Sequence, residues 1–187
     1  QKGVQYSRLD ITHYKPVDRE AVKEIELLAN KYIMANLPIK TYFMDRTEAE
    51  QKFGFRLYQG GVVPGRKIRI VEIEGVDVQA CGGTHCKQTG EVGLIKIIRV
   101  GKIQDGVVRI EFTCGESAIK YVQKQESMIS SIARTLNTPV ERLPEAVNKL
   151  RGELKSVKRR AKQLWNALAS IIITELASKE IFVERLG

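Results

Sequence analysis

A heptad pattern of apolar residues runs through the last third of the chain. Between Val147 and Ile171, apolar residues recur at alternating spacings of three and four. This spacing is typical of an α-helix with one narrow apolar seam. About 25 residues of helix would extend for about 37 Å, and a helix of that length cannot bury its own seam. The sequence therefore predicts a partner helix, from the same chain or from a second copy. The seam residues are Val147, Leu150, Leu154, Val157, Ala161, Leu164, Leu168 and Ile171.

The residues before this helix alternate between strand and helix signals. We predict an α+β fold class: a mixed or antiparallel sheet domain with flanking helices over residues 1–136, then an all-helical, coiled-coil-like region over 137–187. Helices are expected after Asp18, after Thr47, over 116–136 and after Thr138. The expected strands are 4–14, 39–45, 67–74, 76–80, 92–100 and 107–113, and residues 60–65 are expected to form a glycine-rich loop.

Helix starts are indicated by capping residues. Asp18 is expected to cap the first helix, and Thr47 with Glu50 reads as a capping box. Thr138, followed by Pro139, reads as a third N-cap. Cys114, at the end of a predicted strand, is expected in the core.

The chain is strongly basic, with 31 Lys and Arg against 22 Asp and Glu and a net charge of +9. Such an excess favours polyanionic partners, nucleic acid first, although a basic protein can also simply be soluble. The heptad helix carries a dense group of bases, which indicates contact with an RNA phosphate backbone or, alternatively, a solvated flank of a coiled coil. The candidate RNA-binding residues are Lys155, Lys158, Arg159, Arg160 and Lys162.

Three cysteines are too few for a disulfide framework and suit a reducing compartment. No stretch approaches the ~20 apolar residues of a membrane span, and the first residues contain no apolar signal core. We therefore expect a cytoplasmic protein with no membrane partner. The chain does not begin with Met, so it is expected to come from a longer protein.

The segment from Cys81 to Cys86 reads Cys-Gly-Gly-Thr-His-Cys and lies between two predicted strands. A thiolate and an imidazole together suit Zn²⁺, and the two glycines would let the backbone fold tightly between Cys81 and His85. A tetrahedral site requires three or four protein ligands, and the pair supplies two. The spacing therefore leaves two interpretations open: a zinc site, or a buried thiol beside a structural histidine.

Four motifs in order resemble those of the alanyl-tRNA synthetase editing domain, in its archaeal form. The cysteine–histidine segment, followed by Thr-Gly-Glu-Val-Gly at 89–93, is similar to the family's C-x-G-T-H and T-G-x-V-G signatures. Residues 8–14 resemble its R-x-D-x-T-H strand, residues 67–74 resemble the strand before the metal loop, and residues 106–111 resemble its G-V-x-R-I-E segment. These motifs cover residues 8 to 115, and the family continues with helices.

The resemblance implies a zinc-dependent site that hydrolyses Ser or Gly from mischarged tRNA(Ala). It implies Cys81 and His85 as zinc ligands. Asp10 and Thr84 would either orient a ligand or water or only satisfy nearby backbone groups. The family completes the site with an H-x-x-x-H pair upstream of the R-x-D strand, and this sequence contains no such pair. The aminoacylation and ATP-binding motifs of the family are also absent from it, so the chain alone is expected to be inactive.

Three functions follow from these observations. The first is a segment of an alanine–tRNA ligase that edits tRNA(Ala) and forms a homodimer through its C-terminal helices. The second is a free-standing trans-editing deacylase of the same family. The third is a non-enzymatic RNA-binding and oligomerisation module in which the cysteine–histidine loop is structural. The residues upstream of Gln1 would separate the first two.

Overall fold

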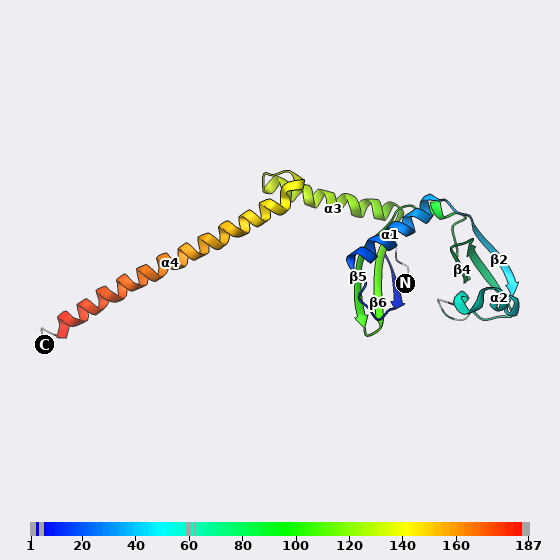
Figure 1. The fold of residues 1–187 in the computed structure, drawn as a ribbon, viewed down its shortest axis with the longest axis horizontal. Helices are drawn as coiled ribbons and strands as arrows, with labels where there is room; N and C mark the ends of the chain where they lie inside the picture. Colours follow the sequence, from blue (N-terminus) through cyan, green and yellow to red (C-terminus); the bar gives the residue numbers. More distant parts are fainter. Residues whose placement is uncertain (1–2, 4–5, 59–60, 62, 185–187) are drawn as a thin grey trace. The chain divides into compact units, whose positions relative to one another are not determined.

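The structure is a computed structural model that describes residues 3, 6–58, 61 and 63–184, without the side chains of 179–184. The chain divides into two compact units, Gln1–Lys124 and Gln125–Gly187. The described part of the first unit holds two three-stranded antiparallel sheets, and the second unit is helical, so the α+β fold class is confirmed (Figure 1). Part of the predicted first strand and of the predicted 60–65 loop lies outside the described residues.

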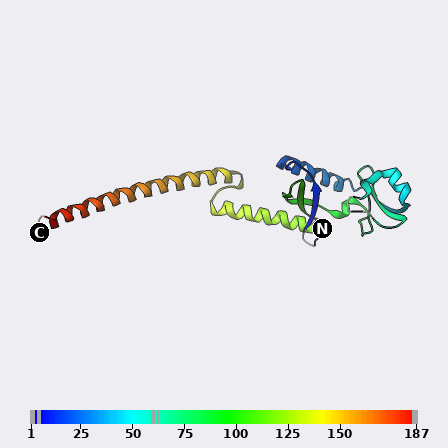
Figure 2. The ribbon, with the colours of Figure 1, turned by 90° about the horizontal axis from the view of Figure 1, so that it is seen from below.

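The first sheet has the order β1–β6–β5. Its strands are β1 (Ser7–Thr12), β5 (Ile95–Gln104) and β6 (Val107–Cys114). Helix α1 (Arg19–Met34) lies along β5 (Figure 2). Two polar side chains of α1 fix this contact. The Glu26 carboxylate accepts hydrogen bonds from Ile97 N and Lys96 Nζ, both at 2.7 Å. The Asn30 amide bonds to both backbone groups of Ile95, at 2.8 and 2.9 Å.

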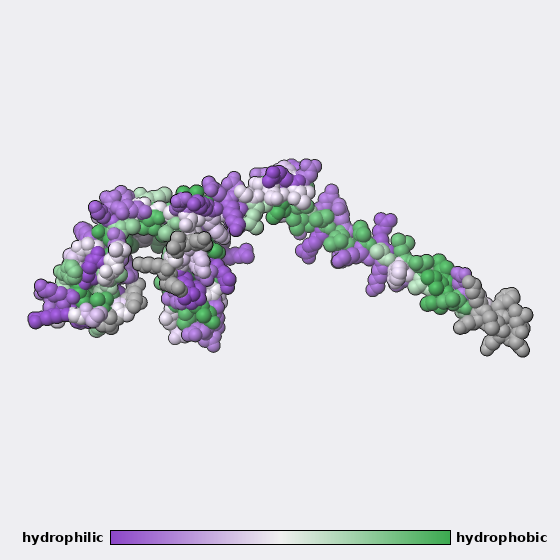
Figure 3. Space-filling model, turned by 180° about the vertical axis from the view of Figure 1, so that it is seen from behind, coloured by the Kyte–Doolittle hydropathy of each residue, from purple (hydrophilic) through white to green (hydrophobic). Residues whose placement is uncertain are grey.

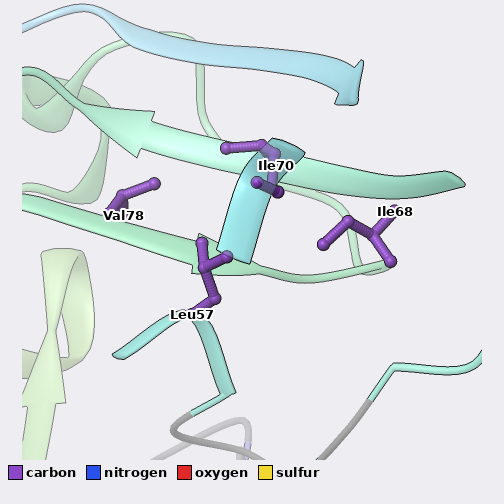
Figure 4. Close-up of a cluster of buried hydrophobic side chains, with 5 residues drawn as sticks. Leu57, Ile68, Ile70 and Val78 are labelled. Atoms are coloured by element: carbon purple, nitrogen blue, oxygen red, sulfur yellow. The ribbon is translucent and has the colours of Figure 1, made fainter. Parts of the chain in front are cut away.

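The second sheet has the order β2–β3–β4 and contains a packed core. Its strands are β2 (Ile39–Asp45), β3 (Lys67–Ile73) and β4 (Asp77–Ala80). Helix α2 (Arg46–Phe53) and the 3-10 turn η1 (Gly54–Tyr58) follow β2. Apolar side chains at alternate positions of β3 point toward these turns, as the period of a strand requires. The buried cluster, shown in Figure 4, comprises Ala49, Leu57, Ile68, Ile70 and Val78.

A buried threonine joins the end of α1 to the segment before β5. Thr89 opens the 3-10 turn η2 (Thr89–Val92) and is 5% exposed. Its hydroxyl donates to Tyr32 O at 2.7 Å and accepts from Leu37 N at 2.8 Å. The chain then turns at Gly93, whose φ is +69° and whose missing Cβ would stand 3.0 Å from the Cα of Gly115. The Thr-Gly-Glu-Val-Gly motif therefore has a clear structural role.

Helix α3 (Gly115–Thr135) and the 3-10 turn η3 (Val140–Arg142) precede α4 (Leu143–Glu184). Helix α4 has 42 residues, which corresponds to about 63 Å. Every residue from Val147 to Ser178 is exposed, including the whole apolar seam. Figure 3 shows apolar and hydrophilic side chains mingled along this helix. An intrachain hairpin, one of the two expected ways to bury the seam, does not form within the described residues.

Several local predictions are corrected. The cap of α2 is Asp45, whose carboxylate accepts from Thr47 N at 3.0 Å, so Thr47 does not open a capping box. Pro139, not Thr138, precedes the turn η3, and no side chain caps it. Cys114 is exposed because the chain leaves the sheet at Gly115, where φ is +60° and α3 begins.

The cap at Asp18 is confirmed, with Ala21 N donating to its carboxylate at 2.8 Å. The predicted strand 92–100 begins later, at Ile95, because η2 occupies residues 89–92. No helix among the described residues combines the length and apolar character that a membrane crossing requires.

Candidate metal centre

The cysteine–histidine segment forms a loop that leaves the second sheet directly after β4. Ile70 pairs with Ala80 across β3 and β4, so Cys81 stands at the next position of the ladder. Cys81 N donates to Arg69 O at 3.0 Å, which extends the pairing by one residue. The first candidate ligand therefore sits at the end of a strand whose backbone is fixed, as the sequence predicted.

The two candidate donor atoms both lie close to Gly83, which is midway between Cys81 and His85 in the sequence. A β-carbon on Gly83 would stand 3.6 Å from Cys81 Sγ and 3.9 Å from His85 Nε2. Neither Gly82 nor Gly83 adopts a positive φ, so neither position requires glycine for its backbone conformation. Glycine at 83 instead leaves space beside the two donor atoms. Cys81 is half-buried and His85 is exposed.

Thiolate sulfur and imidazole nitrogen are two of the ligand types that a zinc site uses. Zinc binds thiolate sulfur at about 2.3 Å and imidazole nitrogen at about 2.0–2.1 Å, so two ligands of one ion must lie close together. The described residues contain no cluster of three or more His, Cys, Asp or Glu side chains able to hold an ion. The described loop therefore offers one thiol and one imidazole near Gly83, and a complete zinc site would need further ligands.

An arginine that sequence reasoning did not single out holds the loop. Arg69, on β3, donates from one guanidinium nitrogen to Cys81 O at 3.1 Å and to Gly83 O at 2.5 Å. Only its position on a basic strand before the loop was visible in the sequence. Its partners depend on the register of β3 and β4, because that register places residue 69 opposite residue 81.

The two residues proposed to orient a ligand or water lie in different places. Thr84 is an exposed member of the loop itself. Asp10 lies on β1 of the other sheet, opposite Arg109 of β6. Its two carboxylate oxygens accept hydrogen bonds from Arg109 Nε and Nη2, both at 2.7 Å. These bonds hold the pKa of the Asp10 carboxyl below its ordinary value.

The candidate RNA-binding residues are all exposed on α4. In the described part of the chain, no ion pair within 4 Å joins any of them to an acidic side chain. Lys155, Lys158 and Lys162 are separated by three and four residues and lie in one row beside the apolar seam. Arg160 lies on the other flank of the seam, and Arg159 lies away from it. The helix therefore divides the predicted set between two flanks.

Residues 68–111 match a family described as "Threonyl and Alanyl tRNA synthetase second additional domain". The match runs from β3 through the metal loop to β6. This part of the chain is therefore similar to the second additional domain of those synthetases.

Across nearly its full length the chain is homologous to archaeal alanine–tRNA ligases. It is 49% identical to the enzyme of Pyrococcus furiosus over 187 residues, which cover 100% of the chain and 20% of that ligase. It is 49% identical to the Archaeoglobus fulgidus enzyme over 91% of the chain and 19% of that ligase. It is 51% identical to the Methanosarcina mazei enzyme over 90% of the chain and 18% of that ligase. The chain spans about a fifth of the length of these curated relatives.

Proposed function

We propose that this chain is the editing region of an alanine–tRNA ligase and hydrolyses the ester of Ser or Gly mischarged onto tRNA(Ala). One observation carries the proposal: Cys81 Sγ and His85 Nε2 lie 3.6 and 3.9 Å from the point where a β-carbon on Gly83 would stand, within the segment that matches the synthetase domain family. The homology to alanine–tRNA ligases supplies the substrate class.

The need for such a site follows from the size of the amino acids. A small pocket discriminates weakly against an analogue that lacks one methyl or gains one hydroxyl. Glycine and serine differ from alanine in these two ways. A second, hydrolytic site is the physical remedy, because it removes the wrong amino acid after charging.

In this proposal Cys81 and His85 hold a zinc ion together with ligands from outside the described residues. Bound zinc would polarise the ester carbonyl or acidify a water molecule. The exposed Thr84 hydroxyl would orient the attacking water or the terminal ribose by a hydrogen bond. Asp10 is engaged with Arg109, so its role would be to fix that guanidinium for a polar group of the substrate.

Helix α4 would serve the same enzyme in two ways. Its exposed seam would pair with the seam of a second copy to form a homodimer. The row formed by Lys155, Lys158 and Lys162 would contact tRNA phosphates, because these ammonium groups have no acidic neighbour in the described structure. Arg159 and Arg160 would add to the positive field of the helix.

The test is made in the complete ligase with Cys81→Ala and a matched control, Cys86→Ala. Cys86 is also a half-buried cysteine of the loop but is not a proposed ligand. We expect Cys81→Ala to abolish release of Ser from mischarged tRNA while charging with Ala stays nearly intact, and Cys86→Ala to retain both. Equal loss of editing and charging in Cys81→Ala would mean that Cys81 is a structural residue.

A second candidate is a non-enzymatic RNA-binding and oligomerisation module. The observation in its favour is that the described residues form no cluster of three metal-capable side chains. On this hypothesis Cys81→Ala leaves release of Ser unchanged, whereas reversing the charge of Lys155 and Lys158 weakens tRNA binding. The same pair of assays therefore separates the two functions.

A further inference from the structure

We propose that Arg69 is a positioning residue for the metal loop: it holds Cys81 and His85 in the geometry that accepts an ion. The inference rests on the proposed function only for the identity of that ion. Its structural basis is the pair of hydrogen bonds from one guanidinium nitrogen to Cys81 O and Gly83 O.

Three hydrogen bonds connect residue 69 to the loop. Cys81 N donates to Arg69 O at 3.0 Å, and the Arg69 side chain returns to Cys81 O at 3.1 Å. Residue 81 is thus held through both its backbone groups. The third bond, to Gly83 O at 2.5 Å, draws the carbonyl two residues later toward the same nitrogen. The Arg69 side chain of β3 thus spans the turn from residue 81 to residue 83.

Gly83 is the residue whose position matters most, because both donors lie close to it. Cys81 Sγ and His85 Nε2 are 3.6 and 3.9 Å from the point where its β-carbon would be. Fixing the Gly83 carbonyl therefore fixes the middle of the segment that separates thiol and imidazole. A loop without this bond would sample arrangements in which the two donors cannot reach one ion.

The chemistry of the side chain suits this task. A guanidinium is planar, permanently charged and presents its donors in a fixed fork, whereas an ammonium is a flexible point charge. Bonds from a charged donor are shorter and about twice as strong as neutral ones. Groups that orient metal ligands without touching the metal change metal affinity by about 10–100-fold when they are removed.

The structure supplies a control at the start of α2, the helix that follows β2 of the same sheet. Arg46 also donates to two loop carbonyls, with its Nε to Gly65 O at 2.9 Å and its Nη2 to Val63 O. It therefore holds a loop by the same kind of contact, but the loop it holds contains no metal-capable residue. Loss of Arg46 reports what any such contact contributes to folding, and loss of Arg69 reports the additional effect on the metal loop.

The experiment compares Arg69→Met, Arg69→Lys and Arg46→Met in the ¹⁵N-labelled 187-residue chain. Two quantities are measured by NMR: the backbone order parameters of Gly82 and Gly83, and the apparent Kd for Zn²⁺ followed at the His85 ring. We expect Arg69→Met to lower the order parameters from about 0.85 to below about 0.6 and to weaken zinc binding by about 10–100-fold. For Arg69→Lys both quantities should lie between those of Arg69→Met and the wild type. Arg46→Met should leave both quantities unchanged.

Unchanged order parameters in Arg69→Met would overturn the proposal, as would equal changes in Arg46→Met. If Arg69→Met does not fold, Arg69→Lys carries the test, because it keeps the charge and loses the fork. Failure of the proposed function looks different. In that case the wild type binds zinc no better than Cys81→Ala, while the order parameters still report whether Arg69 holds the loop.

Discussion

The β2–β3–β4 sheet buries a cluster of apolar side chains, whereas helix α4 exposes its apolar seam. The sheet buries Ile68 and Ile70 almost completely against α2 and η1. Helix α4 leaves Leu154 and Leu164 52% and 72% exposed. The sheet therefore finds its stabilising apolar contacts within this chain, whereas α4 exposes an apolar seam, which in the proposed function pairs with a second helix.

This difference also separates two kinds of function. The cysteine–histidine loop follows β4 directly and is held by an arginine of β3, so its geometry depends on the folded sheet. The seam and the basic row of α4 are exposed, and in the proposed function they contact a second helix and tRNA phosphates. Substitutions in the sheet should therefore change its stability without changing the pairing of α4. Substitutions in the seam of α4 should change that pairing and leave the sheets folded.

The largest effect is expected from Leu154→Asp combined with Leu164→Asp. A buried charge in the seam prevents helix pairing, and even Leu→Ala in a packed core costs about 2–5 kcal/mol. Light scattering should show a dimer in the wild type and a monomer in the double variant, with the sheets intact. The matched control is Ser156→Asp with Gln163→Asp, which adds the same charge away from the seam and should leave the dimer unchanged. A wild type that is monomeric at tens of micromolar contradicts the pairing.

A smaller effect, confined to the sheet, is expected from Ile70→Ala. Ile70 is 0% exposed and central in the cluster, so truncation should lower the free energy of unfolding by about 2–5 kcal/mol. Ile103→Ala, at a position 46% exposed, is the control and should cost little. Urea unfolding measures both. The mass of the particle should not change, and a loss of the dimer in Ile70→Ala would show that the two regions are not independent.

Thr89→Val should cost about 1–3 kcal/mol. Valine keeps the volume of threonine but removes the hydroxyl, which leaves Tyr32 O and Leu37 N without that partner in a buried place. Thr89→Ser retains the hydroxyl and should recover most of the stability. Thermal unfolding of the wild type, Thr89→Val and Thr89→Ser tests this. Equal melting temperatures of the two variants would show that the hydroxyl hydrogen bonds do not cause the loss of stability.

The smallest effect is a pH dependence at Tyr42 of β2. Burial, together with the hydrogen bond from its hydroxyl to Glu72 at 2.7 Å, raises the pKa of Tyr42 to about 12 from 10.0. The folded state therefore favours the protonated phenol. Its contribution to stability is present below pH 10 and is lost as the pH rises through about 12. Alkaline unfolding should be less steep in Tyr42→Phe than in the wild type over this range, and identical profiles would contradict the assignment.

Local signals predicted much of the fold. The strand 39–45 was predicted with its observed bounds, and Asp18 caps α1 as its sequence indicates, because both depend on neighbouring residues alone. The cap of α2 was misplaced because Asp45 and Thr47 are both good caps, and the end of β2 decides between them. Cys114 was expected in the core, but strand alternation does not reveal where a chain leaves its sheet.

The candidate site was predictable only in part. Cys81 and His85 could be identified as candidate ligands from their residue types and their spacing. The contacts of Arg69 could not be predicted, because they connect residues 12 and 14 positions apart through the register of β3 and β4. The pairing of Asp10 with Arg109 spans 99 positions and depends likewise on the β1–β6 register.

The most direct test of the account is the zinc content of the 187-residue chain after dialysis, measured by elemental analysis beside the complete ligase. In the proposed function Cys81 and His85 are two of the zinc ligands, and the other ligands come from elsewhere in the complete ligase. This assignment therefore predicts clearly less than one zinc per chain, and one zinc per subunit in the complete ligase. Stoichiometric zinc that resists a chelator in the isolated chain would contradict it and would point to His13 or Cys86 as a further ligand.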